Sequence, residues 1–169
     1  VIDAGCLSQS SGIVVNDEVI QRYNELKTGR KYKYVFFKMN DDLTEIVVEK
    51  TGPEHATYEE FINELKAVAI DDCRYAVFDF EWDTSDGGKR QKICFYAWYF
   101  AFMLWVFFAH SPLQVPDTAK LKKKMVYAAS KDNLRKKLVG LGAEIQGTDL
   151  SEVSYETVLD KVSKGAGNQ

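Results

Sequence analysis

Residues 73–98 read CRYAVFDFEWDTSDGGKRQKICFYAW, and this stretch decides the fold. Both of its arms are rich in β-branched and aromatic residues, which favour extended structure. Between the arms, Ser85 to Gly88 form a short polar link with two glycines, as expected of a hairpin turn. The stretch therefore predicts two strands, 73–83 and 89–98, joined by a tight turn.

Further elements are predicted on both sides of this hairpin. Upstream, YKYVFFKMN (32–40) and TEIVVEK (44–50) predict a second hairpin. Apolar residues recur at helical spacing in two further stretches, 58–68 and the one from Asn16 to Gly29, where Gly29 closes the helix. Downstream come a basic helix, a short extended piece at 143–146 and a last helix over 151–163 that Ser151 caps. This order predicts one α/β domain with a mixed sheet sandwiched by helices.

The basic helix, AKLKKKMVYAASKDNLRKKL at residues 119–138, carries a strong local charge. It holds seven lysines and one arginine against the single acid Asp132, whereas the whole chain has a net charge of −3. A basic helix on an otherwise acidic protein predicts an acidic partner. A solvated helix face is the alternative that composition alone allows.

Composition argues against several classes of protein. A pI near 5.5 does not suit a general nucleic-acid binder. Three cysteines without a CxxC pair fit a reduced, intracellular protein, and we expect Cys73 and Cys94 to be buried. Two isolated histidines offer no zinc site or catalytic triad, and Asp79, Glu81 and Asp83 are interpreted as a solvated sheet face or edge. We expect no enzyme and no cofactor.

Four strings resemble the actin-depolymerising factor/cofilin family, most of all the fungal cofilins. They are SGIVVNDE at 11–18, KYKYVFFKMNDDLTEIVVEK at 31–50, DCRYAVFDFEW at 72–82, and KMVYAASKDNLRKKL at 124–138 with GTDLSEVSYETVLDKVSKGAG behind it. The resemblance implies an ADF-homology domain over residues 11–167. It also implies an actin-binding protein that binds G-actin and F-actin, severs and depolymerises filaments, and is cytoplasmic and monomeric, with nuclear entry left open.

The resemblance also places two binding surfaces on this chain. The monomer-binding residues would be Ser11, Gly12, Lys122, Lys124, Met125, Asp132, Arg135 and Lys136. The filament-binding residues would be Arg90, Lys92, Asp160, Lys161 and Lys164. Actin is acidic, so exposed lysines would steer its association.

Two further properties follow from the resemblance. In many relatives the serine that matches Ser11 is phosphorylated to block actin binding, and a flexible terminus is the alternative. Phosphoinositide lipids compete with actin for the basic face in this family. A separate alternative function is a phosphoinositide-binding module whose apolar segment dips into the membrane.

The chain departs from the family in two places. Residues 99–115, YFAFMLWVFFAHSPLQV, are extra and extend an apolar run from Ile93 to Ala109. A transmembrane helix needs about 20 apolar residues, so the run is marginal for one; the other interpretations are a functional hydrophobic loop and, as we favour, an unspliced intron. Residues 1–10 are an extra leader, expected to be disordered or artefactual. Either departure would crowd the actin-binding surface.

Overall fold

The computed structural model describes residues 12–68, 72–84, 87–99 and 118–164. These ranges form a six-stranded mixed sheet with strand order β1-β3-β2-β4-β5-β6. The central pairs β3/β2, β2/β4 and β4/β5 are antiparallel, and both edge strands, β1 and β6, pair in parallel with their neighbours. The strands are β1 (Val14–Val15), β2 (Tyr34–Met39), β3 (Glu45–Thr51), β4 (Arg74–Asp83), β5 (Lys89–Trp98) and β6 (Ala143–Gly147).

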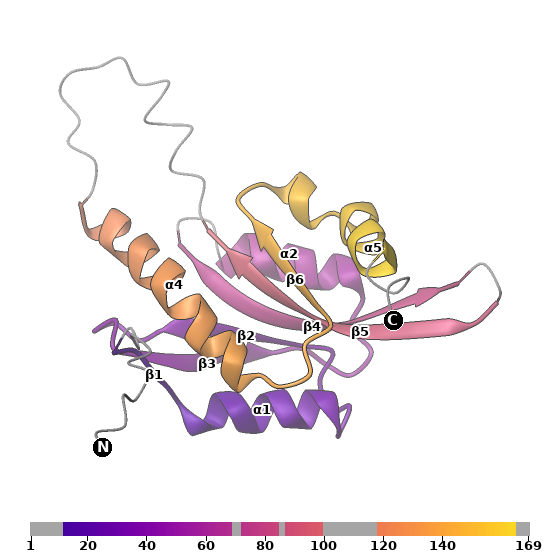
Figure 1. Ribbon diagram of the computed structural model, residues 1–169, viewed down its shortest axis with the longest axis horizontal. Coiled ribbons are helices and arrows are strands. Elements are labelled where there is room, and N and C mark those ends of the chain that lie inside the picture. Colours follow the sequence, from indigo (N-terminus) through magenta and orange to yellow (C-terminus); the bar gives the residue numbers. More distant parts are fainter. Residues whose placement is uncertain (1–11, 69–71, 85–86, 100–117, 165–169) are drawn as a thin grey trace, which may run out of the picture.

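Helices cover both faces of the sheet (Figure 1). The helices α1 (Asp17–Lys27) and α4 (Thr118–Lys137) pack on one face. The opposite face carries α2 (Tyr58–Val68), the short 3-10 helix η1 (Leu150–Val153) and α5 (Tyr155–Lys164). The predicted α/β sandwich is therefore confirmed.

The two cores follow from the alternation of side chains along each strand. In β4, Tyr75 and Val77 face α1 and α4, whereas Ala76, Phe78 and Phe80 face α2 and α5. Strands buried on both faces are apolar at successive positions, which explains why 74–83 lacks a simple apolar–polar alternation. The buried thiols divide in the same way, with Cys73 in the α1/α4 core and Cys94 in the α2/α5 core.

Most of the predicted element boundaries are confirmed to within one or two residues, but the last helix is an exception. Asp149 and Glu152, not Ser151, form a capping box that starts the 3-10 turn η1. Ser154 is then extended, and α5 begins at Tyr155. The prediction of one helix capped by Ser151 was wrong because the chain is extended at Ser154, whose hydroxyl accepts a 3.3 Å hydrogen bond from the Thr157 N–H and so caps α5 instead.

The first helix ends differently from the prediction as well. It stops at Lys27, and the residue with a left-handed backbone is Arg30 (φ 47°), not Gly29. Glycine is needed for another reason, since a Cβ on Gly29 would lie 2.8 Å from the carbonyl oxygen of Glu25. The start of the helix is as predicted, because the Asn16 side chain accepts a hydrogen bond from the Glu18 N–H.

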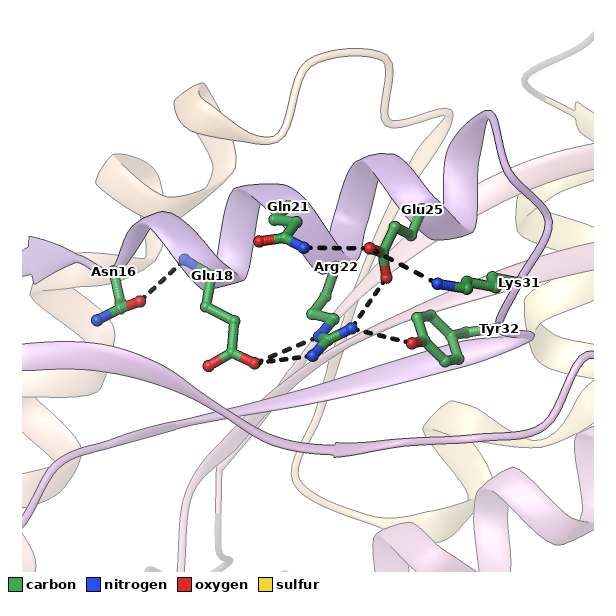
Figure 2. A network of polar contacts seen from close by, with 7 residues as sticks. All are labelled: Asn16, Glu18, Gln21, Arg22, Glu25, Lys31 and Tyr32. Carbon is green, nitrogen blue, oxygen red and sulfur yellow. Dashed lines mark hydrogen bonds and ion pairs between the residues drawn. The ribbon is translucent and has the colours of Figure 1, made fainter.

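A polar network runs along the outer side of α1 (Figure 2). The Arg22 guanidinium donates to Glu18, Glu25 and the hydroxyl of Tyr32. Lys31 extends the network through Glu25, with a nitrogen–oxygen distance of 3.9 Å. These contacts tie the loop after α1 back onto the helix.

The acidic residues of β4 are not all solvated, which corrects the expectation for that strand. Asp79 is 7% exposed and lies 3.9 Å from the Lys33 ammonium, which binds Glu81 more closely at 2.6 Å. Burial raises the pKa of Asp79, and the charge of Lys33 opposes that rise. The group is thus a partly buried structural ion cluster that joins β2 and β4.

Candidate functional site

Helix α4 is fixed to the sheet by buried hydrogen bonds of its inward face. Tyr127 is fully buried, and its hydroxyl accepts a 2.8 Å hydrogen bond from the Met39 N–H. From β4, the Tyr75 hydroxyl donates to the carbonyl oxygen of Tyr127 and contacts the Ser130 hydroxyl. These polar contacts fix the rotation of α4 about its axis, which an apolar interface alone would define less sharply.

Two lysines of α4 form ion pairs within the fold. Lys123 and Arg74 both bind Asp72, each with a nitrogen–oxygen distance of 2.6 Å. Burial raises the pKa of Asp72, but the hydrogen bonds from Lys123 and Arg74 outweigh it and hold the pKa below its usual range. Farther along, Lys131 binds Glu144 of β6 at 2.6 Å.

The outward face of α4 presents a different surface. Met125 is 64% exposed and Leu121 is 47% exposed, and with Ala129 they form an apolar stripe at i, i+4, i+8 spacing beside the exposed Lys122. The far end of the helix exposes Asp132, Arg135 and Lys136. Among the described residues, neither Lys122 nor Lys136 has an ion partner. Their charges are therefore available to an external group.

Two further predicted monomer-binding residues of α4 differ from that stripe. Lys124 is half-buried. Arg135 is exposed, but it forms an ion pair with Glu144 at a nitrogen–oxygen distance of 3.2 Å, so this guanidinium is oriented by β6. Both residues still lie on the same helix as Met125.

The N-terminal segment lies against the same helix. The side-chain amide of Asn133 donates a 2.9 Å hydrogen bond to the carbonyl oxygen of Ile13. Gly12, the next residue toward the N-terminus, is exposed and has a left-handed backbone (φ 69°). Gly12 therefore adjoins the residue that α4 holds, whereas Ser11 lies outside the described residues.

The predicted filament-binding residues gather around β5 and α5. The ammonium of Lys92 donates a 3.0 Å hydrogen bond to the carbonyl oxygen of Val162, which joins β5 to the last turn of α5. Asp160 and Lys164 are exposed and form an i, i+4 ion pair at 2.6 Å, and Lys161 is exposed beside them. Arg90 is exposed on the β4–β5 hairpin, whose end extends beyond the helices in Figure 1.

The two groups of residues lie on opposite faces of the sheet. The first is carried by α4, which packs on the face shared with α1, and the second surrounds α5 on the other face. A chain with this arrangement can contact two partner molecules at once.

Sequence reasoning missed part of this surface. It did not identify Leu121 and Ala129, although their i, i+4, i+8 spacing with Met125 was a readable signal. It also could not separate structural lysines from outward ones, because that division depends on where Asp72 and Glu144 lie in space.

The described residues offer nothing that resembles a metal centre, since they contain no group of three or more His, Cys, Asp or Glu side chains able to hold a metal ion. Within the same ranges, no helix has the length and apolar character needed to cross a membrane. The expected insertion at 99–115 lies outside the described residues except for Tyr99, which is buried in the α1/α4 core.

Comparison with known proteins identifies relatives over nearly the whole chain. Residues 12–99 and 113–163 match the family described as cofilin/tropomyosin-type actin-binding proteins. The chain is 49% identical to cofilin of Mycosarcoma maydis, covering 92% of this chain and 97% of the relative. It is 44% identical to actophorin of Acanthamoeba castellanii, covering 91% and 97%.

Solved structures lead to the same group. A crystal structure of Streptomyces griseoflavus cofilin superimposes with a TM-score of 0.71 at 43% identity, covering 91% of this chain and 99% of that one. Plasmodium berghei actin depolymerization factor 2 gives a TM-score of 0.66 at 29% identity, covering 90% and 97%.

Proposed function

Because the chain belongs to the cofilin/tropomyosin-type family of actin-binding proteins, we propose that it binds monomeric and filamentous actin and severs and depolymerises filaments. The observation that carries this proposal is the outward stripe of α4, where Met125 and Leu121 lie beside the exposed Lys122. An apolar anchor flanked by cations suits an acidic protein partner. The activity is binding, with no cofactor and no catalysis.

The monomer-binding surface would consist of the α4 stripe and the N-terminal segment. We assign to it the predicted residues Ser11, Gly12, Lys122, Lys124, Met125, Asp132, Arg135 and Lys136. Contact with a second actin subunit in the filament would use Arg90, Lys92, Asp160, Lys161 and Lys164. The placement of the two sets on opposite faces of the sheet supports this division, because one molecule on a filament side must reach two subunits.

Severing follows from the same geometry. If the two surfaces fit neighbouring subunits only when these are rotated from their relaxed positions, binding favours the rotated filament. The energy of two contacts would then be stored as a change of twist at the edge of each decorated stretch.

Filament cosedimentation and monomer binding together test the proposal. Lys122→Ala with Met125→Ala should weaken binding to both monomers and filaments, whereas Arg90→Ala with Lys161→Ala should weaken filament binding alone. Lys66→Ala is the matched control, since Lys66 is an exposed lysine of α2 on the other face from α4. A loss for Lys66→Ala equal to that for Lys122→Ala with Met125→Ala, or no binding by the unaltered chain, would refute the assignment.

The remaining expectations belong to the same proposal. A protein of this kind would act as a monomer on the cytoplasmic actin cytoskeleton, with nuclear entry as a further destination. Its domain would span 11–167, with an insertion at 99–115. The family-matched ranges 12–99 and 113–163 leave a shorter interval, 100–112, unmatched, which supports an insertion within those bounds. Comparing actin binding with and without residues 99–115 tests whether the insertion hinders the contact.

Phosphoinositide headgroups are a second ligand for the outward lysines of α4. Lys122, Lys136 and Lys137 are exposed and lack ion partners among the described residues, which suits an anionic surface. Vesicles that contain phosphatidylinositol bisphosphate should compete with actin monomers for the chain, and Lys136→Ala should weaken both ligands. Lipid binding that leaves actin binding unchanged would contradict a shared face.

A further inference from the structure

We propose that Asn133 is a positioning residue, which holds the N-terminal segment at Ile13 against α4 and so sets where Gly12 meets actin. The inference rests on the proposed function and deepens it, because it names the group that assembles two separate parts of the monomer-binding surface.

The N-terminal segment needs such a contact because β1 is a minimal edge strand. It has two residues and pairs in parallel with β3 through Val14 N–H to Thr44 and Asn16 N–H to Ile46, at 2.9 and 3.0 Å. Backbone groups alternate in direction along a strand, so the carbonyl of Ile13 points away from β3. An edge carbonyl of this kind needs a donor from outside the sheet.

Asn133 supplies that donor from α4. Its Nδ2 lies 2.9 Å from the Ile13 carbonyl oxygen, across 120 residues of sequence, and the contact is half-buried. Its neighbours on the helix could not do the same, since Asp132 is exposed and Leu134 belongs to the core. At this position of α4 the side chain must reach the Ile13 carbonyl and donate an N–H group to it, as the amide of Asn133 does.

Gly12 explains why this contact would have a functional consequence. Its φ of 69° turns the backbone immediately before the clamped carbonyl, and a Cβ at Gly12 would meet no atom within 4 Å. Glycine is therefore needed there for its conformation, since space is open. A fixed carbonyl at Ile13 next to a fixed turn at Gly12 gives Gly12 a defined position.

Other contacts hold β1 itself, so losing Asn133 should leave the fold intact. Val15 is buried, Ile13 packs against the α1/α4 core, and the Asn16 side chain donates to Glu45 at 2.9 Å. The hydrogen bond from Asn133 to Ile13, which we call the clamp, instead pre-organises the segment for its partner. A segment that is already ordered loses less conformational entropy on binding.

The test compares Asn133→Ala and Asn133→Asp, which is nearly isosteric but cannot donate, with Asn63→Ala as control. Asn63 is an exposed asparagine of α2, so the control reproduces the change in helix propensity on a face remote from α4. Hydrogen exchange of the Val14 and Asn16 amides, measured without actin, should accelerate about five- to tenfold in both Asn133 variants, as for one lost hydrogen bond. Exchange in β2 and β4 should not change.

Affinity for actin monomers should fall by a similar factor in both Asn133 variants, and the chain should still unfold in one cooperative transition whose midpoint falls by no more than one lost hydrogen bond explains. Gly12→Ala should also weaken binding, and combining it with Asn133→Ala should cost little more than the worse single change, because both act on one segment. Additive losses would overturn the positioning role. So would faster exchange with unaltered affinity.

The clamp and the proposed function can fail separately. Unchanged exchange at Val14 and Asn16 in Asn133→Ala refutes the clamp, even if the chain binds actin. If the unaltered chain does not bind actin, the proposed function fails and the positioning role falls with it, whereas the exchange data still report whether the contact exists.

Discussion

Tyr127 shows how a single side chain joins α4 to the centre of the sheet. Its ring is buried against Tyr75, with ring centroids 5.0 Å apart, and its hydroxyl accepts the N–H of Met39. Tyr127→Phe keeps the ring but leaves that N–H without a partner in the core. We expect a loss of about 1–3 kcal/mol in the free energy of unfolding, measured by urea denaturation.

The matched control is Tyr155→Phe. Tyr155 is 40% exposed and packs on Phe80 with ring centroids 5.1 Å apart. The same loss of a hydroxyl there should change stability by less than about 0.5 kcal/mol. Equal effects at both tyrosines would contradict the anchoring role of the Tyr127 hydroxyl.

Asp72 makes a prediction about pH. Its pKa is lower in the folded protein than in the unfolded chain, so its ion pairs stabilise the fold above the unfolded value and are lost as pH falls through the folded value. Asp72→Asn should therefore lower the free energy of unfolding by about 1–3 kcal/mol at pH 7. The difference from the unaltered chain should begin to shrink below about pH 4, the usual pKa of an aspartate in an unfolded chain, and disappear as pH falls through the lower folded value.

The control for this experiment is Asp160→Asn. Asp160 also forms a 2.6 Å ion pair with a lysine, but both partners are more than half exposed. An exposed i, i+4 pair contributes little, so this change should have almost no effect at either pH. A pH-independent effect of Asp72→Asn would mean that packing, not charge, makes Asp72 important.

At the scale of elements, the structure differs from the sequence-based prediction at η1 and α5, which were predicted to be one helix. The Asp149–Glu152 capping box should matter, whereas the Ser151 side chain makes no hydrogen bond described in this region. Asp149→Ala should lower the thermal midpoint by about 2–4 °C. Ser151→Ala should leave it nearly unchanged, and the reverse order would restore the original prediction.

The other elements were predictable for identifiable reasons. The hairpin at 73–98 was predictable from its two aromatic-rich arms and the glycine turn between them. The structure confirms it, since β4 and β5 pair in register from Arg74↔Trp98 to Asp83↔Lys89. β1 was missed because two residues are too few to show a period. The positive φ of Arg30 was not predicted, because arginine rarely adopts that backbone conformation.

For the candidate site, the sequence located the helix but not its rotation. Seven lysines within residues 119–138 predict a binding helix, yet Lys123 and Lys131 turn inward to Asp72 and Glu144. That division requires β6 and the start of β4 to be placed in space. The contact between Asn133 and Ile13 spans 120 residues and leaves no local pattern at all.

The whole molecule is an acidic body with a basic helix on one face. This asymmetry predicts that association with acidic actin monomers slows as salt rises. Combining Lys122→Ala with Lys136→Ala should lower the association rate at low salt by about threefold to tenfold and flatten its salt dependence. Stopped-flow binding at several ionic strengths measures both effects.

Lys50→Ala with Lys66→Ala is the control at this scale, because it removes the same net charge from residues outside α4. If both double variants slow association equally, net charge alone is responsible and α4 has no special part. A dissociation rate that changes more than the association rate would point instead to short-range contacts of the lysines.

Cys73 lies in the α1/α4 core and Cys94 in the α2/α5 core, so the reactivity of each thiol reports the opening of one face of the sheet. Both thiols are buried, and burial raises the pKa of Cys94 to about 12, so neither should react with a thiol reagent until its own layer loosens. With Cys6 replaced by serine, a chain that retains one thiol at a time would be labelled at a rate set by a single face. An actin molecule bound to α4 should then slow labelling of Cys73 more than that of Cys94. The ratio of the two labelling rates would therefore show which face of the sheet the partner covers.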